Sequence, residues 1–148
     1  MKGAAMLAIS LLWNAGSTAG EVSFVTACEG AVKQRLLAPS TYHLVKASED
    51  KEAVSFDAYF AKSGYPESVQ KLMRLTAKDT PVRLVASIEY VSSSAAGVPV
   101  RSRSRCTYES LGQPSLSDET GKLMVEIDGK SNTQWLAERS AARRQDRN

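Results

Sequence analysis

The chain has 148 residues, of which 43% are hydrophobic and 24% charged, as expected for one globular domain and too apolar for a disordered protein. Its formal net charge is only +3 at pH 7. Nucleic-acid-binding domains normally carry a concentrated basic surface, so this charge argues against a nucleic-acid partner.

The first 19 residues have the pattern of a secretory signal peptide. Lys2 provides a positive start, residues 3–13 are an apolar run, and residues 15–20 are small residues that suit cleavage, which we place after Ala19. An uncleaved membrane anchor is disfavoured because a spanning helix needs about 20 apolar residues. We therefore predict export to the periplasm or the medium, with no transmembrane segment in the mature chain.

The chain contains two cysteines, Cys28 and Cys106. In an oxidising compartment, such a pair most simply forms one disulfide. Residues 25–28 also resemble a lipobox, in which Cys28 would be lipidated. We disfavour lipidation because Glu21 would lie in the cleavage region and Cys106 would be left unpaired. The sequence thus predicts a Cys28–Cys106 bridge.

Residues 22–37 are predicted to form the first helix of the mature chain. Apolar side chains recur at helical spacing and place Cys28 on the buried side of this helix. Ser23 can cap its start, and Pro39 ends it because proline has no N–H to donate.

Residues 41–47 favour a strand, and residues 48–51 form a polar sequence typical of a turn. Residues 53–56 would then continue as a second strand. Residues 57–61 have a more helical composition, although their boundaries within 53–65 stay open. Pro66 suits the first turn of another helix, whose apolar positions continue to Thr76.

The clearest strand signal spans residues 82–91 and 98–109, which read as an antiparallel hairpin joined by a small polar connection. Alternation places Cys106 on the same side as Val98, Val100 and Tyr108, the side expected to face the core. The disulfide would therefore tie the first helix to this hairpin.

After the hairpin, residues 111–120 are expected to be a loop and residues 123–127 a last short strand. Asp128 and Gly129 suit a turn, and Ser131 with Gln134 forms a capping-box pattern for a final helix. We assign the globular domain to residues 20–138. Residues 139–148 form a basic tail, expected to fray from Ala141 rather than anchor to an anionic membrane, because its apolar face is short.

These elements predict an α+β domain. A short antiparallel sheet is built on the central hairpin, with the N-terminal helix packed on one face and tied to it by the disulfide.

Two stretches resemble a family of small exported bacterial proteins and domains. The first carries the cysteine of the helix and the exit Leu36-Leu37-Ala38-Pro39-Ser40-Thr41, and the second is the hairpin that ends in Arg101, Cys106 and Tyr108. The resemblance covers about residues 27–45 and 84–108. It implies the same fold and disulfide but no activity, because the family is largely uncharacterised. The hairpin tip, residues 91–96, departs from the Asp-Ala-x-Asn-like sequence common in the family.

Arg101, Arg103 and Arg105 are the candidate binding residues. On a strand they share one face at a spacing of about 6.6 Å, opposite Cys106. Arginine forks suit phosphates and carboxylates, such as those of lipopolysaccharide, peptidoglycan or an acidic protein. The alternative is a solvated outer face, with the arginines paired across strands to Glu89 or Glu126.

No sequence pattern indicates an enzyme, a metal site or a cofactor. His43 is the only histidine and lacks an evident carboxylate or cysteine partner. Nucleophile-elbow, P-loop and dinucleotide-binding motifs are absent. We therefore expect a small exported, non-enzymatic binding or accessory protein without a cofactor. The alternatives are an envelope-associated structural protein without a discrete ligand and, third, a hydrolase or hydrolase inhibitor.

Overall fold

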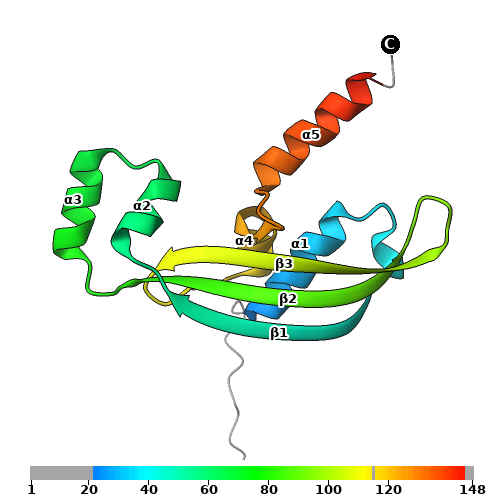
Figure 1. The fold of residues 1–148 in the computed structure, drawn as a ribbon, viewed down its shortest axis with the longest axis horizontal. Coiled ribbons are helices and arrows are strands. Elements are labelled where there is room, and N and C mark those ends of the chain that lie inside the picture. Colours follow the sequence, from blue (N-terminus) through cyan, green and yellow to red (C-terminus); the bar gives the residue numbers. More distant parts are fainter. Residues whose placement is uncertain (1–21, 115, 146–148) are drawn as a thin grey trace, which may run out of the picture.

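A computed structural model describes residues 22–114 and 116–145, so the predicted signal peptide lies outside the described residues. The predicted α+β class is confirmed (Figure 1). Its elements are α1 (Phe24–Arg35), η1 (Pro39–Thr41), β1 (His43–Ala53), α2 (Phe56–Ser63), α3 (Glu67–Thr76), β2 (Pro81–Ser93), β3 (Pro99–Leu111), α4 (Asp118–Met124), β4 (Glu126–Ile127) and α5 (Asn132–Gln145).

Helix α1 forms as its sequence predicts. The Ser23 side chain accepts a hydrogen bond from the Thr26 backbone N–H, which caps the first turn. Leu36 leaves the helix in an extended conformation before Pro39 begins η1. The buried side of α1 consists of Phe24, Ala27, Cys28, Ala31 and Val32.

The four strands form one antiparallel sheet in the order β1-β2-β3-β4. The predicted hairpin is confirmed and is longer than expected, because β2 and β3 pair from Pro81–Leu111 to Ser93–Pro99. The predicted turn at residues 48–51 is wrong. Strand β1 continues through this segment to Ala53, with one irregularity between Leu44 and Lys46. Its polar side chains fit an edge strand because they remain in contact with water.

The inner face of the sheet packs against α1 and holds the core. Leu84, Ala86, Ile88 and Tyr90 of β2 are buried there, together with both cysteines. The predicted Cys28–Cys106 disulfide is present, with a Cα–Cα distance of 5.8 Å. It occupies the sulfur atom that lipidation of Cys28 would require.

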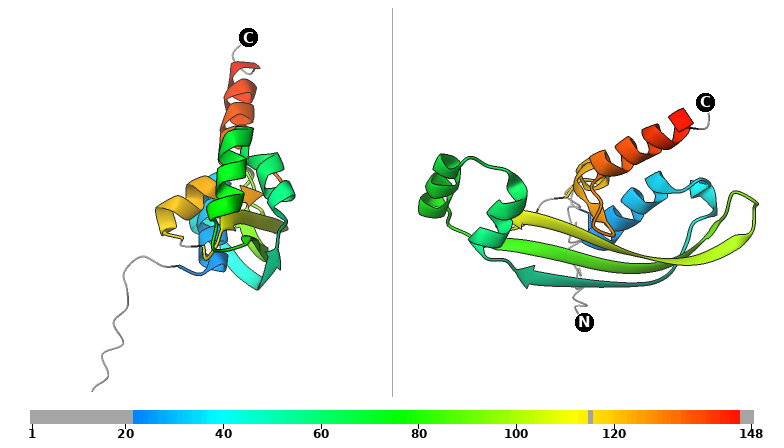
Figure 2. Two further views of the ribbon diagram at one scale, coloured as in Figure 1. Left: turned by 90° about the vertical axis from the view of Figure 1, so that its left-hand side faces the viewer. Right: turned by 45° about the horizontal axis from the view of Figure 1, so that its top comes forward.

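Helices α2 and α3 extend from one end of the sheet (Figures 1 and 2). Phe60 of α2 is 3% exposed and forms aromatic contacts with Phe56, Tyr59 and Tyr65. The second strand expected over residues 53–56 does not form, because β1 ends at Ala53 and α2 begins at Phe56. The aromatic cluster fixes the boundaries that the sequence left open. Helix α3 occupies the predicted residues but has no buried side chain.

The segment after β3 differs from its prediction. Residues 118–124 form α4 rather than the end of a loop and the start of a strand, and β4 contains only Glu126 and Ile127. Gly121 allows α4 to approach α1 closely, because a Cβ atom there would lie 2.7 Å from the Cβ of Ala27. Tertiary packing therefore overrides the low helix propensity of glycine.

The last turn and helix follow their local signals. Asp128 and Gly129 both have positive φ, and Ile127 pairs with Lys130 across the turn. The Ser131 backbone N–H donates to Oε1 of Gln134, and the Gln134 backbone N–H donates to Oγ of Ser131, so both hydrogen bonds of the capping box form. Helix α5 then projects away from the sheet and continues to Gln145, beyond Ala141, where we expected fraying (Figure 1).

Within the described ranges, no helix has the length and apolar character needed to cross a membrane.

Candidate functional site

The outer face of the sheet carries the three predicted arginines. Strand β3 alternates so that Cys106 and Ser104 are buried while Arg101, Arg103 and Arg105 are exposed on the opposite side. The predicted placement on one solvent-facing side is therefore confirmed. Their shared origin on one strand gives a row of cations at strand spacing.

Glu89 of β2 anchors one part of this row. Its carboxylate forms ion pairs with Arg101 and Arg103, in line with the cross-strand alternative considered from the sequence. The hydrogen bond from Arg101 lowers the pKa of Glu89, and nearby positive charges reinforce this shift. Both guanidinium groups nevertheless remain accessible, because the Arg101 and Arg103 side chains are 62% and 81% exposed.

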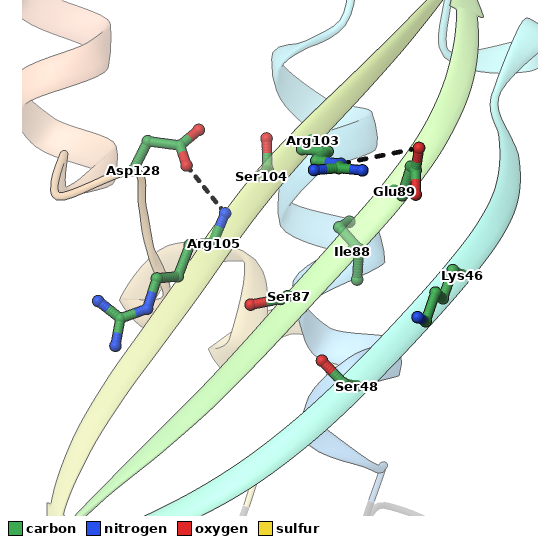
Figure 3. Close-up of a pocket in the computed structure, with 9 residues that line it drawn as sticks. All are labelled: Lys46, Ser48, Ser87, Ile88, Glu89, Arg103, Ser104, Arg105 and Asp128. Atoms are coloured by element: carbon green, nitrogen blue, oxygen red, sulfur yellow. Dashed lines mark hydrogen bonds and ion pairs between the residues drawn. The ribbon is translucent and has the colours of Figure 1, made fainter.

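Arg105 differs from its neighbours because no ion pair joins its guanidinium to another described residue. Its backbone N–H donates to Oδ1 of Asp128, at 2.8 Å, while its side chain points away from that carboxylate (Figure 3). Lys46 of β1 likewise forms no ion pair within the described part of the chain. Two of the cations on this face are thus available to an external anion.

These cations surround an open hollow of about 480 Å³ on the outer face of the sheet (Figure 3). Strand pairing places Ser48, Ser87 and Arg105 in one row across β1, β2 and β3, beside the row formed by Lys46, Glu89 and Arg103. The hollow is lined by Lys46, Ser48, Ser87, Ile88, Glu89, Arg103, Ser104, Arg105 and Asp128. Hydroxyl, ammonium and guanidinium donors therefore lie together around it.

The other end of the same face is different, because its charges are paired. Arg83 forms ion pairs with Glu52 and Glu109. Lys62 of α2 pairs with Glu109 and Glu126, both at 3.5 Å. Glu126 is therefore engaged here and does not pair with the arginine row, unlike Glu89. The excess of positive charge is confined to the end that carries Arg101, Arg103 and Arg105.

Lys46, Ser48 and Ser87 are members of this site that the sequence analysis did not identify. The sequence placed Lys46 on a strand over residues 41–47 without a pairing partner and placed Ser48 in a turn, although Ser48 and Ser87 are paired neighbours in the sheet. The alternation of β2 gives the side of Ser87, but only the register of β1 brings the three residues together.

His43 begins β1 as an exposed residue and is not among the residues that line the hollow. No group of three or more histidine, cysteine, aspartate or glutamate side chains suited to a metal ion occurs in the portion of the chain that the structure describes.

Comparison of the chain with protein-family models, with curated proteins and with solved structures finds no match.

Proposed function

We propose that this chain is a small exported, non-enzymatic binding protein that recognises an anionic partner. The binding surface is the cationic face, defined as Lys46, Arg101, Arg103 and Arg105 together with the hydroxyl groups of Ser48 and Ser87. The observation that carries this proposal is the presence of two cations, Lys46 and Arg105, that form no ion pair with any described residue and lie beside a hollow with hydroxyl donors.

The chemistry of this face favours oxyanions. Guanidinium groups donate two parallel hydrogen bonds to a phosphate or carboxylate, and the serine hydroxyls add donors without adding charge. Glu89 holds Arg101 and Arg103 in place, which reduces the conformational entropy that these side chains lose on binding. Because the face is open, it suits a group presented on a larger molecule.

Export is supported by the N-terminal sequence pattern and by the disulfide, since disulfides persist mainly in oxidising compartments. The buried disulfide also leaves both cysteines without a thiol for nucleophilic catalysis. These features support an exported protein that uses no cysteine nucleophile.

The test compares affinities for two probes, inorganic pyrophosphate and a tetraglutamate peptide, by isothermal titration calorimetry at low ionic strength. The triple variant Arg101→Ala/Arg103→Ala/Arg105→Ala should bind at least about tenfold more weakly than the wild type, because each charge-assisted hydrogen bond contributes about 1.5–3 kcal/mol. Circular dichroism and retention of the disulfide establish that the variant is folded.

A matched control removes three charges elsewhere, with Lys71→Ala/Lys78→Ala/Arg144→Ala. These exposed residues belong to α3, the segment after it and α5. The control should retain the wild-type affinity if the cationic face binds the probe. Equal losses in the two triple variants would mean that only net charge matters and would overturn the proposal. Absence of binding to either probe would favour a structural protein without a discrete ligand.

A further inference from the structure

Strand β1 is an open edge of the sheet. It pairs with β2 on one side, and no described strand pairs with its other side, which forms the lower rim of the sheet in Figures 1 and 2. Nine of its 11 residues are exposed. From Lys46 to Ala53 its register with β2 is continuous, so this part of the edge is regular.

The direction of the free backbone groups follows from the ladder. The Val54 N–H donates to the Pro81 carbonyl at 3.0 Å, which makes this a hydrogen-bonded pair. Such pairs alternate along an antiparallel ladder. Ser48 and Asp50 therefore direct their backbone groups toward β2, whereas Ala47 and Glu49 direct theirs toward the open edge.

The side chains along this edge are complementary to themselves. If a second copy of β1 runs antiparallel with Ser48 opposite its own equivalent, Lys46 of each copy lies opposite Asp50 of the other. In this register Ala47 forms hydrogen-bonded pairs with Glu49 of the other copy, which matches the direction of the free backbone groups. Neither Lys46 nor Asp50 forms an ion pair within the described chain, and one carboxylate oxygen of Asp50 accepts a hydrogen bond from the Lys51 backbone N–H, at 2.8 Å.

Two neighbouring registers also bring the free backbone groups of both copies opposite each other, but their side-chain charges match less well. An axis at Glu49 places two glutamates directly opposite each other, and like charges in that position are destabilising. An axis at Ala47 places Lys46 opposite Ser48 and forms neither ion pair. The axis at Ser48 is therefore the best match between charge and hydrogen bonding.

We propose that two copies of this chain associate through β1, about a two-fold axis at Ser48, to form one continuous antiparallel sheet of eight strands. This contact is isologous, since each copy uses the same edge. It places the cationic faces of both copies on the same side of the extended sheet. In the dimer, Lys46 is engaged by Asp50 of the other copy, so the cationic face then presents Arg105, Arg101 and Arg103 to an anion. The dimer itself does not require an anionic partner, and its tests use no anionic probe.

The first test is covalent capture. At a non-hydrogen-bonded antiparallel pair the Cα atoms lie about 4.5 Å apart, within the range that a disulfide can bridge. Ser48→Cys should therefore form a covalent dimer under mild oxidation, seen on a non-reducing gel, and peptide mapping should assign the crosslink to the two introduced cysteines. Glu52 lies on the same strand but away from the axis, so the Glu52→Cys variant should form at least about tenfold less covalent dimer. Equal crosslinking of both variants would overturn the proposed register.

The second test is the association equilibrium of the protein without added cysteine, measured by sedimentation equilibrium at low ionic strength. Lys46→Asp should raise the dimer dissociation constant at least tenfold, and the double variant Lys46→Asp/Asp50→Lys should restore it. Ala47→Pro should also weaken association, because it removes an N–H at the open edge while leaving the ladder with β2 intact. Lys71→Asp is the charge-matched control. A wild type that stays monomeric to about 0.5 mM, or a Lys46→Asp variant that dimerises normally, would overturn the proposal.

Discussion

Removal of the Cys28–Cys106 disulfide should be the most damaging change to the stability of this domain. The bridge closes a loop with a sequence separation of 78 residues. The chain-entropy model assigns about 4.5 kcal/mol to such a loop, and measured values for native bridges are about 2–5 kcal/mol. Domains of this size are stable by only about 5–15 kcal/mol, so the loss is a large fraction of the total.

The variant Cys28→Ala/Cys106→Ala tests this effect without placing new polar groups in the core, where both cysteines are fully buried. Urea unfolding followed by circular dichroism should show a midpoint lowered by about 2 M, since small proteins lose about 1–3 kcal/mol per molar urea. Intact-mass measurement with and without reductant should show that the wild type carries the bridge, as a difference of two hydrogens. A variant whose unfolding free energy lies within about 1 kcal/mol of the wild type would show that the bridge contributes little to stability.

Three further predictions concern the cationic face, the packing of α4 and export. The hydrogen bond from Arg101 lowers the pKa of Glu89, so the stabilisation from this pair should be present above the unfolded pKa of glutamate and be lost as the pH falls through the lower folded value. In a ¹³C NMR titration, the pKa of Glu89 should lie below the usual glutamate range and should rise in the Arg101→Ala variant. An unchanged pKa in that variant would contradict the pairing. Gly121→Ala should destabilise the domain by up to about 2 kcal/mol in urea unfolding, because overpacking against Ala27 costs about 1–3 kcal/mol and the better helix propensity returns about 1; a more stable variant would mean that α1 and α4 move apart freely. Expression of the full chain in a Gram-negative bacterium should yield periplasmic or secreted protein beginning at Gly20, checked by N-terminal sequencing, whereas an intact start in the cytoplasm would exclude cleavage after Ala19.

The elements that were predicted correctly are those with strong local signals. The Ser23 cap, the alternation of the hairpin and the capping box at Ser131 all involve interactions within a few residues or between adjacent strands. The disulfide could be predicted because the signal-peptide pattern and the inward-facing positions expected for Cys28 and Cys106 indicated the same pair. Local and long-range requirements agree in these segments.

The errors occurred where tertiary structure decides the conformation. The charged residues 48–51 resemble a turn, but they form a strand because β2 offers a long hydrogen-bonding partner. Helix α4 contains a glycine that local propensity disfavours, and it forms because Gly121 permits close packing on Ala27. Neither partner can be identified from the short segment alone.

The same limit applies to the candidate site. The spacing of Arg101, Arg103 and Arg105 was sufficient to place them on one face. Two of these arginines are paired and the third forms no ion pair with a described residue. This division depends on the cross-strand position of Glu89, which the sequence offered only as an alternative. The contribution of Lys46 depends on the register of β1, which the mistaken turn concealed.

Binding of an oxyanion to the cationic face can be located by mapping backbone amide shifts in ¹H–¹⁵N NMR spectra during titration with inorganic pyrophosphate. Binding in the hollow should give saturable shifts concentrated at Lys46, Ser48, Ser87, Arg103 and Arg105, with the paired end around Arg83 unaffected. Shifts centred on α3 or α5, or no saturable shifts at all, would contradict it.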